Sequence, residues 1–169
     1  MRMNDEPVLN KRSTGPTPKP AEPLAKRIKR LVGAASYAVL CTQGEGQPYG
    51  SLVAFAFADD LRTAVFATPT ATRKYRLLEE CRRVALLVDN RPSHMDDMMK
   101  VEAVTATGQA SEIERGPQWE SWAAVLLEKH PYLQAFVRAE SCALFTIDVT
   151  RFFHVSRFQE VLQWVPADR

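Results

Sequence analysis

The sequence predicts an α+β protein built on a small, mostly antiparallel β-barrel of about six to seven strands with flanking helices. Three observations lead to this prediction. Short runs rich in apolar, β-branched and aromatic residues recur along the chain, short turns join the first three runs, and helical periodicity appears only between some of them. Strands joined by short turns pair antiparallel, because a parallel pair needs a long crossover connection.

Length and composition fit one globular domain. The chain has 169 residues, of which 46% are hydrophobic and 25% charged. A net charge of +2 gives no bulk electrostatic reason to expect nucleic acid. Because no run approaches the roughly 18 apolar residues of a membrane span, and the N-terminus does not resemble a signal peptide, we expect a soluble protein. Cys41, Cys81 and Cys142 lack zinc or disulfide spacing, which favours a cytoplasmic location.

The N-terminal residues differ in composition from the rest. Residues 1–22 are rich in proline, charge and small polar side chains, which predicts a disordered arm. The ordered domain is therefore expected at residues 23–166. It begins with Leu24, Ile28, Leu31 and Val32 at helical spacing, and this helix is expected to end near Gly33.

The remaining elements follow from changes in period. Glycine-containing residues 44–47 and the pair Asp59–Asp60 mark turns, and residues 90–99 read as a loop. The uninterrupted apolar run at 84–88 predicts a strand buried on both faces. Helices are expected at 72–81, at 117–129 and, as a short piece, at 132–138. The predicted strands are 37–42, 48–58, 61–67, 84–88, 102–113, 143–149 and 152–164.

The turn before the second helix carries a functional signal. Thr70 or Thr72 can cap that helix, whose first backbone N–H groups are unpaired and attract anions. Arg73 and Lys74 follow at an end where the helix dipole disfavours cations by about 0.3–1 kcal/mol each. A bound phosphate would explain two cations there. The alternative to a phosphate site is an exposed helix end that is basic for no functional reason.

Four stretches occur in the order found in a known family. They are 47–55 (QPYGSLVAF), 66–68 (FAT), 72–74 (TRK) and 84–89 (VALLVD). Together they resemble the successive motifs of the pyridoxamine 5′-phosphate oxidase-related FMN-binding split barrels, and the resemblance extends over residues 24–164. The stretch 48–53 is most similar to the branch that includes haem-utilisation proteins. The resemblance implies that the barrel is a split β-barrel.

The resemblance also implies a function. It implies an FMN-binding flavoprotein that acts as an oxidoreductase. Such a protein would exchange hydride or electrons with a small-molecule substrate or a donor such as NAD(P)H. It further implies a homodimer with FMN at the subunit interface. The turn would grip the phosphate, the second strand would run beside the ring, and residues 90–91 would come from the partner subunit. The implied cofactor-binding residues are Ser51, Leu52, Val53, Thr68, Thr72, Arg73, Lys74, Asn90 and Arg91.

Some features depart from the family pattern. The closing stretch 157–164 lacks the glycine that often precedes Phe158, which leaves the role of Arg157 open. No substrate-phosphate site and no catalytic residue can be assigned, and the tail after Trp164 has no histidine to ligate haem. His94 is a possible proton donor beside a flavin, whereas the loop 93–97 around it is not expected to bind metal.

Three alternatives remain at this stage. One is a non-catalytic flavin or haem carrier or sensor on the same barrel, favoured by the missing substrate site. A second is another phosphate-bearing cofactor, such as the deazaflavin F420, in place of FMN. A third is a barrel that binds single-stranded nucleic acid, which the near-neutral charge disfavours.

Overall fold

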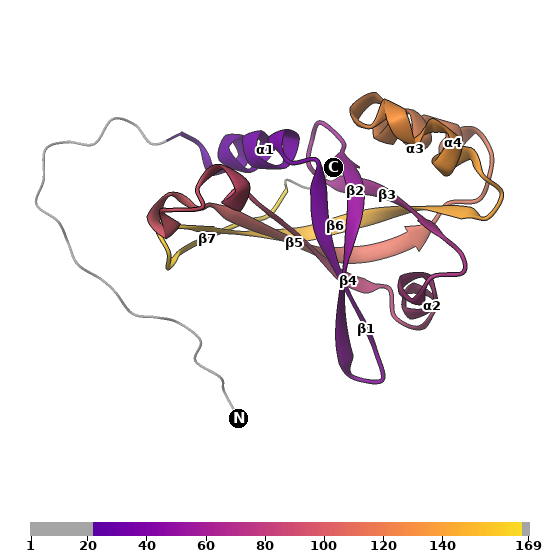
Figure 1. Cartoon of the computed structure of the whole chain (residues 1–169), viewed down its shortest axis with the longest axis horizontal. Coiled ribbons are helices and arrows are strands. Elements are labelled where there is room, and N and C mark those ends of the chain that lie inside the picture. The colour runs from indigo at the N-terminus through magenta and orange to yellow at the C-terminus, as the bar shows by residue number, and fades with distance from the viewer. Residues whose placement is uncertain (1–21, 167–169) are drawn as a thin grey trace, which may run out of the picture.

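The computed structural model describes residues 22–166 (Figure 1). The disordered arm predicted at residues 1–22 lies outside this range except for Glu22. The helices are α1 (Leu24–Ala34), α2 (Arg73–Glu80), α3 (Pro117–Lys129) and α4 (Gln134–Arg138). Short 3₁₀ turns span Arg91–Ser93, Met98–Lys100 and Pro131–Leu133. The strands are β1 (Tyr37–Gly44), β2 (Gln47–Phe57), β3 (Thr63–Pro69), β4 (Arg83–Asp89), β5 (Ala103–Glu112), β6 (Cys142–Ser156) and β7 (Glu160–Trp164).

The strands close into a barrel. Their order is β3-β2-β1-β4-β5-β6-β7, and a further pairing of β3 with β6 joins the ends of the first six. All the ladders are antiparallel. Strand β7 pairs only with β6 and lies outside the closed ring. The predicted fold class is therefore confirmed: an α+β protein with a mostly antiparallel split β-barrel and flanking helices.

The barrel interior forms the main core. Large side chains from successive strands, including Leu40, Phe55, Phe66, Leu86 and Phe152, are almost completely buried in it. Buried and more exposed side chains alternate along β1, β4 and β5, as the pleat of a β-strand requires. The barrel therefore has a filled interior, and any ligand site must lie on its outside or at its ends.

Helices pack against the barrel in two places. Ile28, Leu31 and Val32 of α1 pack onto the main core, and α1 contacts β2, β4 and β5. Helices α3 and α4 lie together over β2, β3 and β6 (Figure 1), where Trp119 and Leu126 belong to a second apolar cluster. The predicted helices at 117–129 and 132–138 thus cover one side of the barrel.

Lysine 129 ties α3 to the end of α1. Its ammonium donates a hydrogen bond to the Val32 carbonyl at 2.8 Å and lies 4.0 Å from the centroid of the Phe55 ring. Burial lowers the pKa of Lys129 to about 8. The Val32 carbonyl is in the last turn of α1, where carbonyl groups lack helical partners, so this lysine satisfies a helix end.

Strand β4 is buried on one face only, contrary to the prediction from its apolar run. Val84, Leu86 and Val88 point into the core, whereas Ala85 and Leu87 are half-exposed on the outside of the barrel. The prediction of burial on both faces assumed a covering layer on the outside. Helix α1 does contact β4, but its buried residues share the core cluster of Val84, Leu86 and Val88, and the outer face stays partly exposed. An apolar strand therefore presents part of its surface to solvent.

The C-terminal strands were divided wrongly in the sequence prediction. The predicted break at Thr150–Arg151 lies inside the single long strand β6, and the chain turns instead at residues 157–159. Thr107 pairs with Arg151 but the next residue, Gly108, pairs with Val149, so Thr150 is an extra residue in a β-bulge. The bulge shifts the inward-outward alternation by one residue, which in the sequence looks like the end of a strand.

Gly108 is required at this bulge. A Cβ at residue 108 would overlap the Asp148 carbonyl and would lie 3.0 Å from the Ile147 side chain. The turn after β6 is tight as well: Arg157 and Phe158 have φ values of 48° and 70°, in the left-handed region. The resemblance left the role of Arg157 open, and its backbone is part of this turn.

No helix among residues 22–166 is long and apolar enough to cross a membrane. The three cysteines are free thiols: Cys142 is buried, and Cys41 and Cys81 are partly exposed.

A charged cluster joins α1 to the ends of β5 and β6. The Glu102 carboxylate forms ion pairs with the guanidinium groups of Arg27 and Arg30, at 3.5 Å each. Nε2 of His154 also lies 3.5 Å from this carboxylate. His154 is completely buried, and its Nδ1 has no hydrogen-bond partner. Burial lowers the pKa of His154, and the Arg27 charge acts in the same direction.

We predict that stability falls when His154 is forced to accept a proton. Because its pKa is lower in the folded chain than the unfolded value of about 6.5, the neutral ring is favoured by folding. The stabilisation is fully present above about pH 6.5 and is lost as pH falls towards the folded pKa. Urea unfolding at a series of pH values should show this loss in the native chain and a flatter profile in His154→Gln. An unchanged slope in that variant, compared with His94→Gln, would assign the pH dependence elsewhere.

Candidate functional site

The predicted cofactor residues on β2 lie where this strand has a free edge. Strand β1 pairs with β2 along residues 47–54, but β3 pairs only with residues 55–57. Ser51, Leu52 and Val53 therefore have one strand neighbour instead of two. Leu52 is 71% exposed, Val53 is buried, and the Ser51 hydroxyl is buried with no hydrogen-bond partner. This segment has unused hydrogen-bonding capacity beside exposed apolar surface.

Two threonine hydroxyls organise the turn between β3 and α2. Thr72 is the N-cap of α2: its hydroxyl accepts from the Tyr75 N–H at 3.3 Å and donates to the Pro69 carbonyl at 2.9 Å. Thr68, completely buried at the end of β3, lies 3.0 Å from Thr72 oxygen to oxygen. The capping prediction is thus confirmed for Thr72 and not for Thr70, whose hydroxyl donates to the Ser141 carbonyl at 3.3 Å.

Arg73 and Lys74, the two cations of the turn, come directly after Thr72 in the sequence. Arg73 is exposed, with its guanidinium 5.1 Å from the centroid of the Tyr49 ring on β2. Lys74 is half-buried and donates to the Leu52 carbonyl at 3.1 Å across the free edge. Burial lowers the pKa of Lys74. Both cations therefore lean from the helix end towards β2, beside backbone N–H groups that precede the first intrahelical hydrogen bonds.

A cavity of about 430 Å³ runs along this free edge. Leu52, Val53 and Lys74 line it on one side. The opposite wall is apolar and comes from the segment that connects and includes α3 and α4, with Leu126, Leu133 and Phe136. The structure thus brings three of the predicted cofactor residues into one cavity, and Thr72 and Arg73 sit in the turn beside it.

Asn90 and Arg91 lie in a different cavity, of about 660 Å³, which also includes Leu52. The Asn90 side-chain oxygen accepts from the Glu102 N–H at 2.7 Å, and Arg91 donates to Asp89 at 2.8 Å. Both side chains are therefore engaged with the ends of β4 and β5. The structure does not bring them together with Thr72, Arg73 and Lys74 in one chain.

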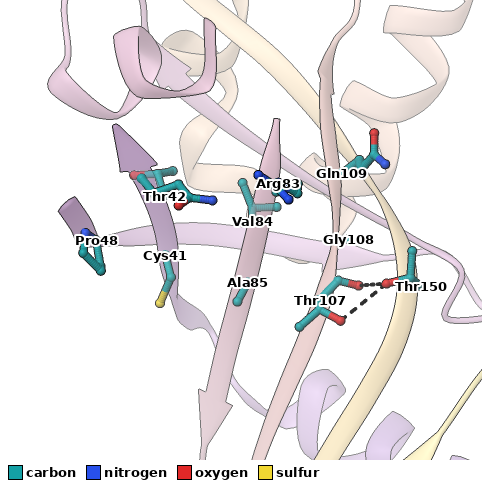
Figure 2. A pocket seen from close by; sticks show the side chains of 11 residues that line it. Cys41, Thr42, Pro48, Arg83, Val84, Ala85, Thr107, Gly108, Gln109 and Thr150 are labelled. Carbon is teal, nitrogen blue, oxygen red and sulfur yellow. Dashed lines mark hydrogen bonds between the residues drawn. The ribbon is translucent and has the colours of Figure 1, made fainter. Parts of the chain in front are cut away.

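The outside of the sheet formed by β1, β4 and β5 carries a third cavity, of about 530 Å³ (Figure 2). Cys41, Ala85 and Thr107 lie across it, and Thr107 hydrogen-bonds to Thr150 at the bulge. None of the predicted cofactor residues lines this cavity. This cavity lies over the part of the barrel where the outer face of the apolar strand β4 is half-exposed.

Sequence reasoning missed one group of residues at the 430 Å³ cavity. Tyr37 and Tyr132 line it, and their hydroxyl oxygens are 3.2 Å apart. Tyr132 also lies 3.3 Å from Nδ1 of His130, a histidine that is only 2% exposed. His130 is the C-cap of α3. The contact joins residues 95 positions apart, so no local pattern could have indicated it.

His94 lies in a loop whose neighbouring residues Ser93 and Met95 line the 660 Å³ cavity, which also includes Leu52. His94 is the C-cap of the 3₁₀ turn Arg91–Ser93, and Asp97 caps the next turn by accepting from the Met99 N–H at 3.0 Å. The Lys100 and Met99 hydrogen bonds lower the pKa of Asp97. No group of three or more His, Cys, Asp or Glu residues suited to a metal ion occurs within the described part of the chain.

Comparison with known proteins places this barrel in a family. The family model for pyridoxamine 5′-phosphate oxidase matches residues 24–156. The chain therefore belongs to the pyridoxamine 5′-phosphate oxidase family, and the resemblance inferred from its motifs is confirmed. No curated protein matches the chain.

Solved structures share the fold at low sequence identity. A haem-binding protein from Mycobacterium smegmatis matches with a TM-score of 0.75 and 20% identity, over 86% of this chain and 60% of that chain. ChuZ from Campylobacter jejuni matches with a TM-score of 0.72 and 10% identity, over 83% and 58% of the two chains. An FAD-binding protein from Mesorhizobium loti matches with a TM-score of 0.62 and 15% identity, over 77% and 92%. The chain thus spans about 60% of the first two proteins, and these likenesses concern the fold.

We predict that Thr72 holds the start of α2 in place. Replacement by alanine removes the N-cap and leaves the Tyr75 N–H without its partner, which should lower the free energy of unfolding by about 1 kcal/mol. Thr72→Ser keeps the hydroxyl and serves as the matched control. Denaturant unfolding of both variants measures the effect, and equal stability of the alanine and serine variants would show that the cap contributes little.

Proposed function

We propose that the protein is an FMN-binding flavoprotein that acts as an oxidoreductase on a small molecule. The observation that carries this proposal is the meeting of two features that are apart in the sequence: a basic, threonine-capped helix end and the free edge of β2. The first suits a phosphate and the second suits the edge of a planar ring with hydrogen-bonding groups. Family membership supports the same proposal.

The residues present fit a phosphate-bearing ligand. Arg73 offers a bidentate fork and Lys74 a point charge, and both reach towards the same strand. Lys74 is half-buried with a carbonyl as its partner, so a nearby anion would compensate for the hydration that the ammonium has lost. The first-turn N–H groups of α2 add further donors. Thr72 would act mainly by fixing the helix end, because its hydroxyl is already fully used within the turn.

The free edge of β2 fits the ring of FMN. Ser51, Leu52 and Val53 would present backbone groups to the ring edge, and the unpartnered Ser51 hydroxyl is a further group that a polar ligand atom could satisfy. When bound, FMN would supply hydride or electron transfer, while the protein supplies binding and orientation. A small molecule would be the substrate, and NAD(P)H is a suitable electron donor.

We further propose that the chain works as a homodimer with FMN at the interface. The outer face of β1, β2, β4 and β5 is rich in apolar side chains, with Val39 opposite both Leu52 and Leu87 in the ladders. Leu52 is 71% exposed in the single chain. A second copy on this face would bury these side chains and would bring Asn90 and Arg91 of one chain towards the cofactor of the other. The three free thiols suit a reducing compartment, and we propose the cytoplasm.

The alternative is a flavin or haem binding or sensor protein without turnover. It is favoured by the apolar cavity that contains Tyr37 and Tyr132, because a tyrosine can ligate haem iron. The first solved structure compared above is described as haem-binding. Titration with haem and with FMN, followed by visible spectra, separates the two cofactors. Steady-state oxidation of NADH or NADPH by the FMN-loaded protein separates an oxidoreductase from a carrier.

We predict that the purified protein is yellow or takes up added FMN, and that Arg73→Ala combined with Lys74→Ala abolishes this. Because charge-assisted hydrogen bonds contribute about 1.5–3 kcal/mol each, the pair should weaken FMN binding on the order of 100-fold or more. Thermal unfolding without FMN should change little. Fluorescence titration with FMN measures the affinity.

Arg76→Ala is the matched control for this experiment. Arg76 is an exposed cation on the same helix, one turn beyond the proposed phosphate site. It should bind FMN with nearly unchanged affinity. A colourless protein that takes up no FMN would refute the proposal, and equal losses of binding and stability in the double variant would make the turn merely structural.

We predict that Leu87→Glu disrupts the dimer. A charge placed in the centre of the proposed apolar interface must be desolvated without a partner, so the variant should be monomeric and should lose FMN with its interface. Light scattering during gel filtration measures the mass. Val161→Glu is the control, because Val161 is half-exposed on β7, outside the barrel. Native protein that is monomeric, or a Leu87→Glu dimer, would contradict the proposed assembly.

A further inference from the structure

A chain of hydrogen bonds leads from the 430 Å³ cavity to a buried histidine. It joins Tyr37, Tyr132 and His130, and it ends at the backbone carbonyl of Phe55, 2.9 Å from Nε2 of His130. The proposed cofactor site uses none of these residues. The outer end of this hydrogen-bond chain is accessible, since Tyr37 is 57% and Tyr132 is 64% exposed. Its inner end, at His130, is buried.

The direction of each hydrogen bond follows from the inner end. A carbonyl only accepts, so Nε2 of His130 must carry a hydrogen. In the neutral ring Nδ1 is then the acceptor, and the Tyr132 hydroxyl donates to it. Because Tyr132 has one hydrogen, Tyr37 donates to Tyr132. The Tyr37 oxygen keeps its lone pairs for a group in the cavity.

The same chain can run in the opposite direction when His130 is protonated. Nδ1 then carries a hydrogen and donates to Tyr132, Tyr132 donates to Tyr37, and the Tyr37 hydroxyl points its hydrogen to the cavity. The inner hydrogen bond to Phe55 is unchanged in both states. The hydrogen-bond chain thus has two complete arrangements that differ by one proton.

The surroundings of His130 are well defined. Tyr37 stacks on its ring at 6.5 Å between centroids, and Tyr132 meets it edge-on at 5.8 Å. The neighbouring Lys129 turns its ammonium to the Val32 carbonyl on α1. Phe55, on the β2 side, contributes a neutral carbonyl. The tyrosine hydroxyls are therefore the titratable groups through which a proton can reach the ring.

We propose that Tyr37, Tyr132 and His130 form a proton relay that serves the ligand in the 430 Å³ cavity. A ligand X–H bond breaks as an O–H bond forms on Tyr37; the Tyr37 hydrogen passes to Tyr132, and the Tyr132 hydrogen passes to Nδ1 of His130. The ligand loses one proton, the imidazole gains one, and no electron moves. The reverse sequence returns the proton. This role rests on the proposed function, in which Leu52 and Val53, two residues that line this cavity, would hold the flavin ring.

The relay fits a flavoprotein site for a chemical reason. Reduction and reoxidation of a flavin move protons as well as electrons, and an apolar cavity offers few groups that exchange them. The wall from α3 and α4 contributes Leu126, Leu133 and Phe136. His130 and Tyr132 lie within that same segment, so the segment that makes the cavity apolar also supplies its connection for protons.

The relay is first tested without cofactor. Nitrogen NMR of the histidines in the full chain should show His130 as the neutral Nε2–H tautomer, assigned by loss of its signal in His130→Gln. Tyr132→Phe should shift the Nδ1 resonance towards that of a nitrogen without a hydrogen bond, and Tyr75→Phe should leave it unchanged. Tyr75 is a suitable control, since its hydroxyl donates to Glu112 on another side. An Nδ1–H tautomer, or no response to Tyr132→Phe, would overturn the relay.

The second test uses the FMN-loaded protein. After photochemical reduction, reoxidation by dioxygen is followed in H₂O and in D₂O. Two electrons and two protons pass from the reduced flavin to dioxygen, which becomes hydrogen peroxide. Tyr132→Phe and His130→Gln should each slow reoxidation at least about 10-fold and lower the solvent isotope effect. FMN affinity should stay within about threefold of the native value, and Tyr75→Phe should behave as native. Unchanged rates and isotope effects in both relay variants would overturn the role.

The two tests separate the relay from the proposed function. A protein that shows the NMR signature but binds no FMN would refute the proposed function and support the hydrogen-bond chain. A protein that binds FMN with native affinity in all variants, with no change in isotope effect, would support the proposed function and refute the relay.

Discussion

The hydrogen-bonded pairing of β3 with β6 determines where a ligand can bind. Strand β3 pairs with β6 from Thr63 to Pro69, but with β2 at only three positions. Because β3 follows β6, it diverges from β2 after Phe66, and residues 47–54 of β2 are left without a strand neighbour on that side. Helix α2 starts at the end of β3 and therefore points its first turn at this edge. The pairing that closes the barrel between β3 and β6 thus separates β3 from the edge of β2. Arg73 and Lys74, the cations of the turn, reach towards that edge.

The fold was predictable because its signals are local. Alternating strands, short turns, the helix stripes and the threonine cap each lie within a few residues of one another, and the structure has them nearly where the sequence indicates. The residues of the candidate phosphate site are also close in the sequence, since Thr68, Thr72, Arg73 and Lys74 fall within seven consecutive residues. Their role in binding a phosphate stays a prediction. A prediction from inward-outward alternation fails where a strand contains one extra residue. Thr150 shifts the phase of β6, and an alternation test reads that shift as a chain turn.

Other features depend on contacts between distant residues and could not be read from local patterns. The run at 84–88 is apolar on both faces, yet whether each face is covered depends on where the helices pack. The Tyr37, Tyr132 and His130 contacts join β1 to the segment after α3, and only the folded barrel brings them together. The free edge of β2 likewise depends on a pairing that β3 makes elsewhere. In each case the missing information is tertiary, so local propensity offers no substitute.

The bulge at Thr150 allows one strand to serve two structures. Before it, β6 closes the barrel against β3; after it, β6 carries β7 outside the ring. The extra residue also decides which side chains face inward in the second half, because a shift by one residue exchanges the two faces of a strand. Phe152, His154 and Ser156 are buried in the phase that the bulge sets. A regular β6 that kept Thr150 without the bulge would expose Phe152 and His154 and bury Phe153 and Val155 in their place. The bulge therefore lets β6 hold one residue more than the facing part of β5 without exchanging its inward and outward side chains.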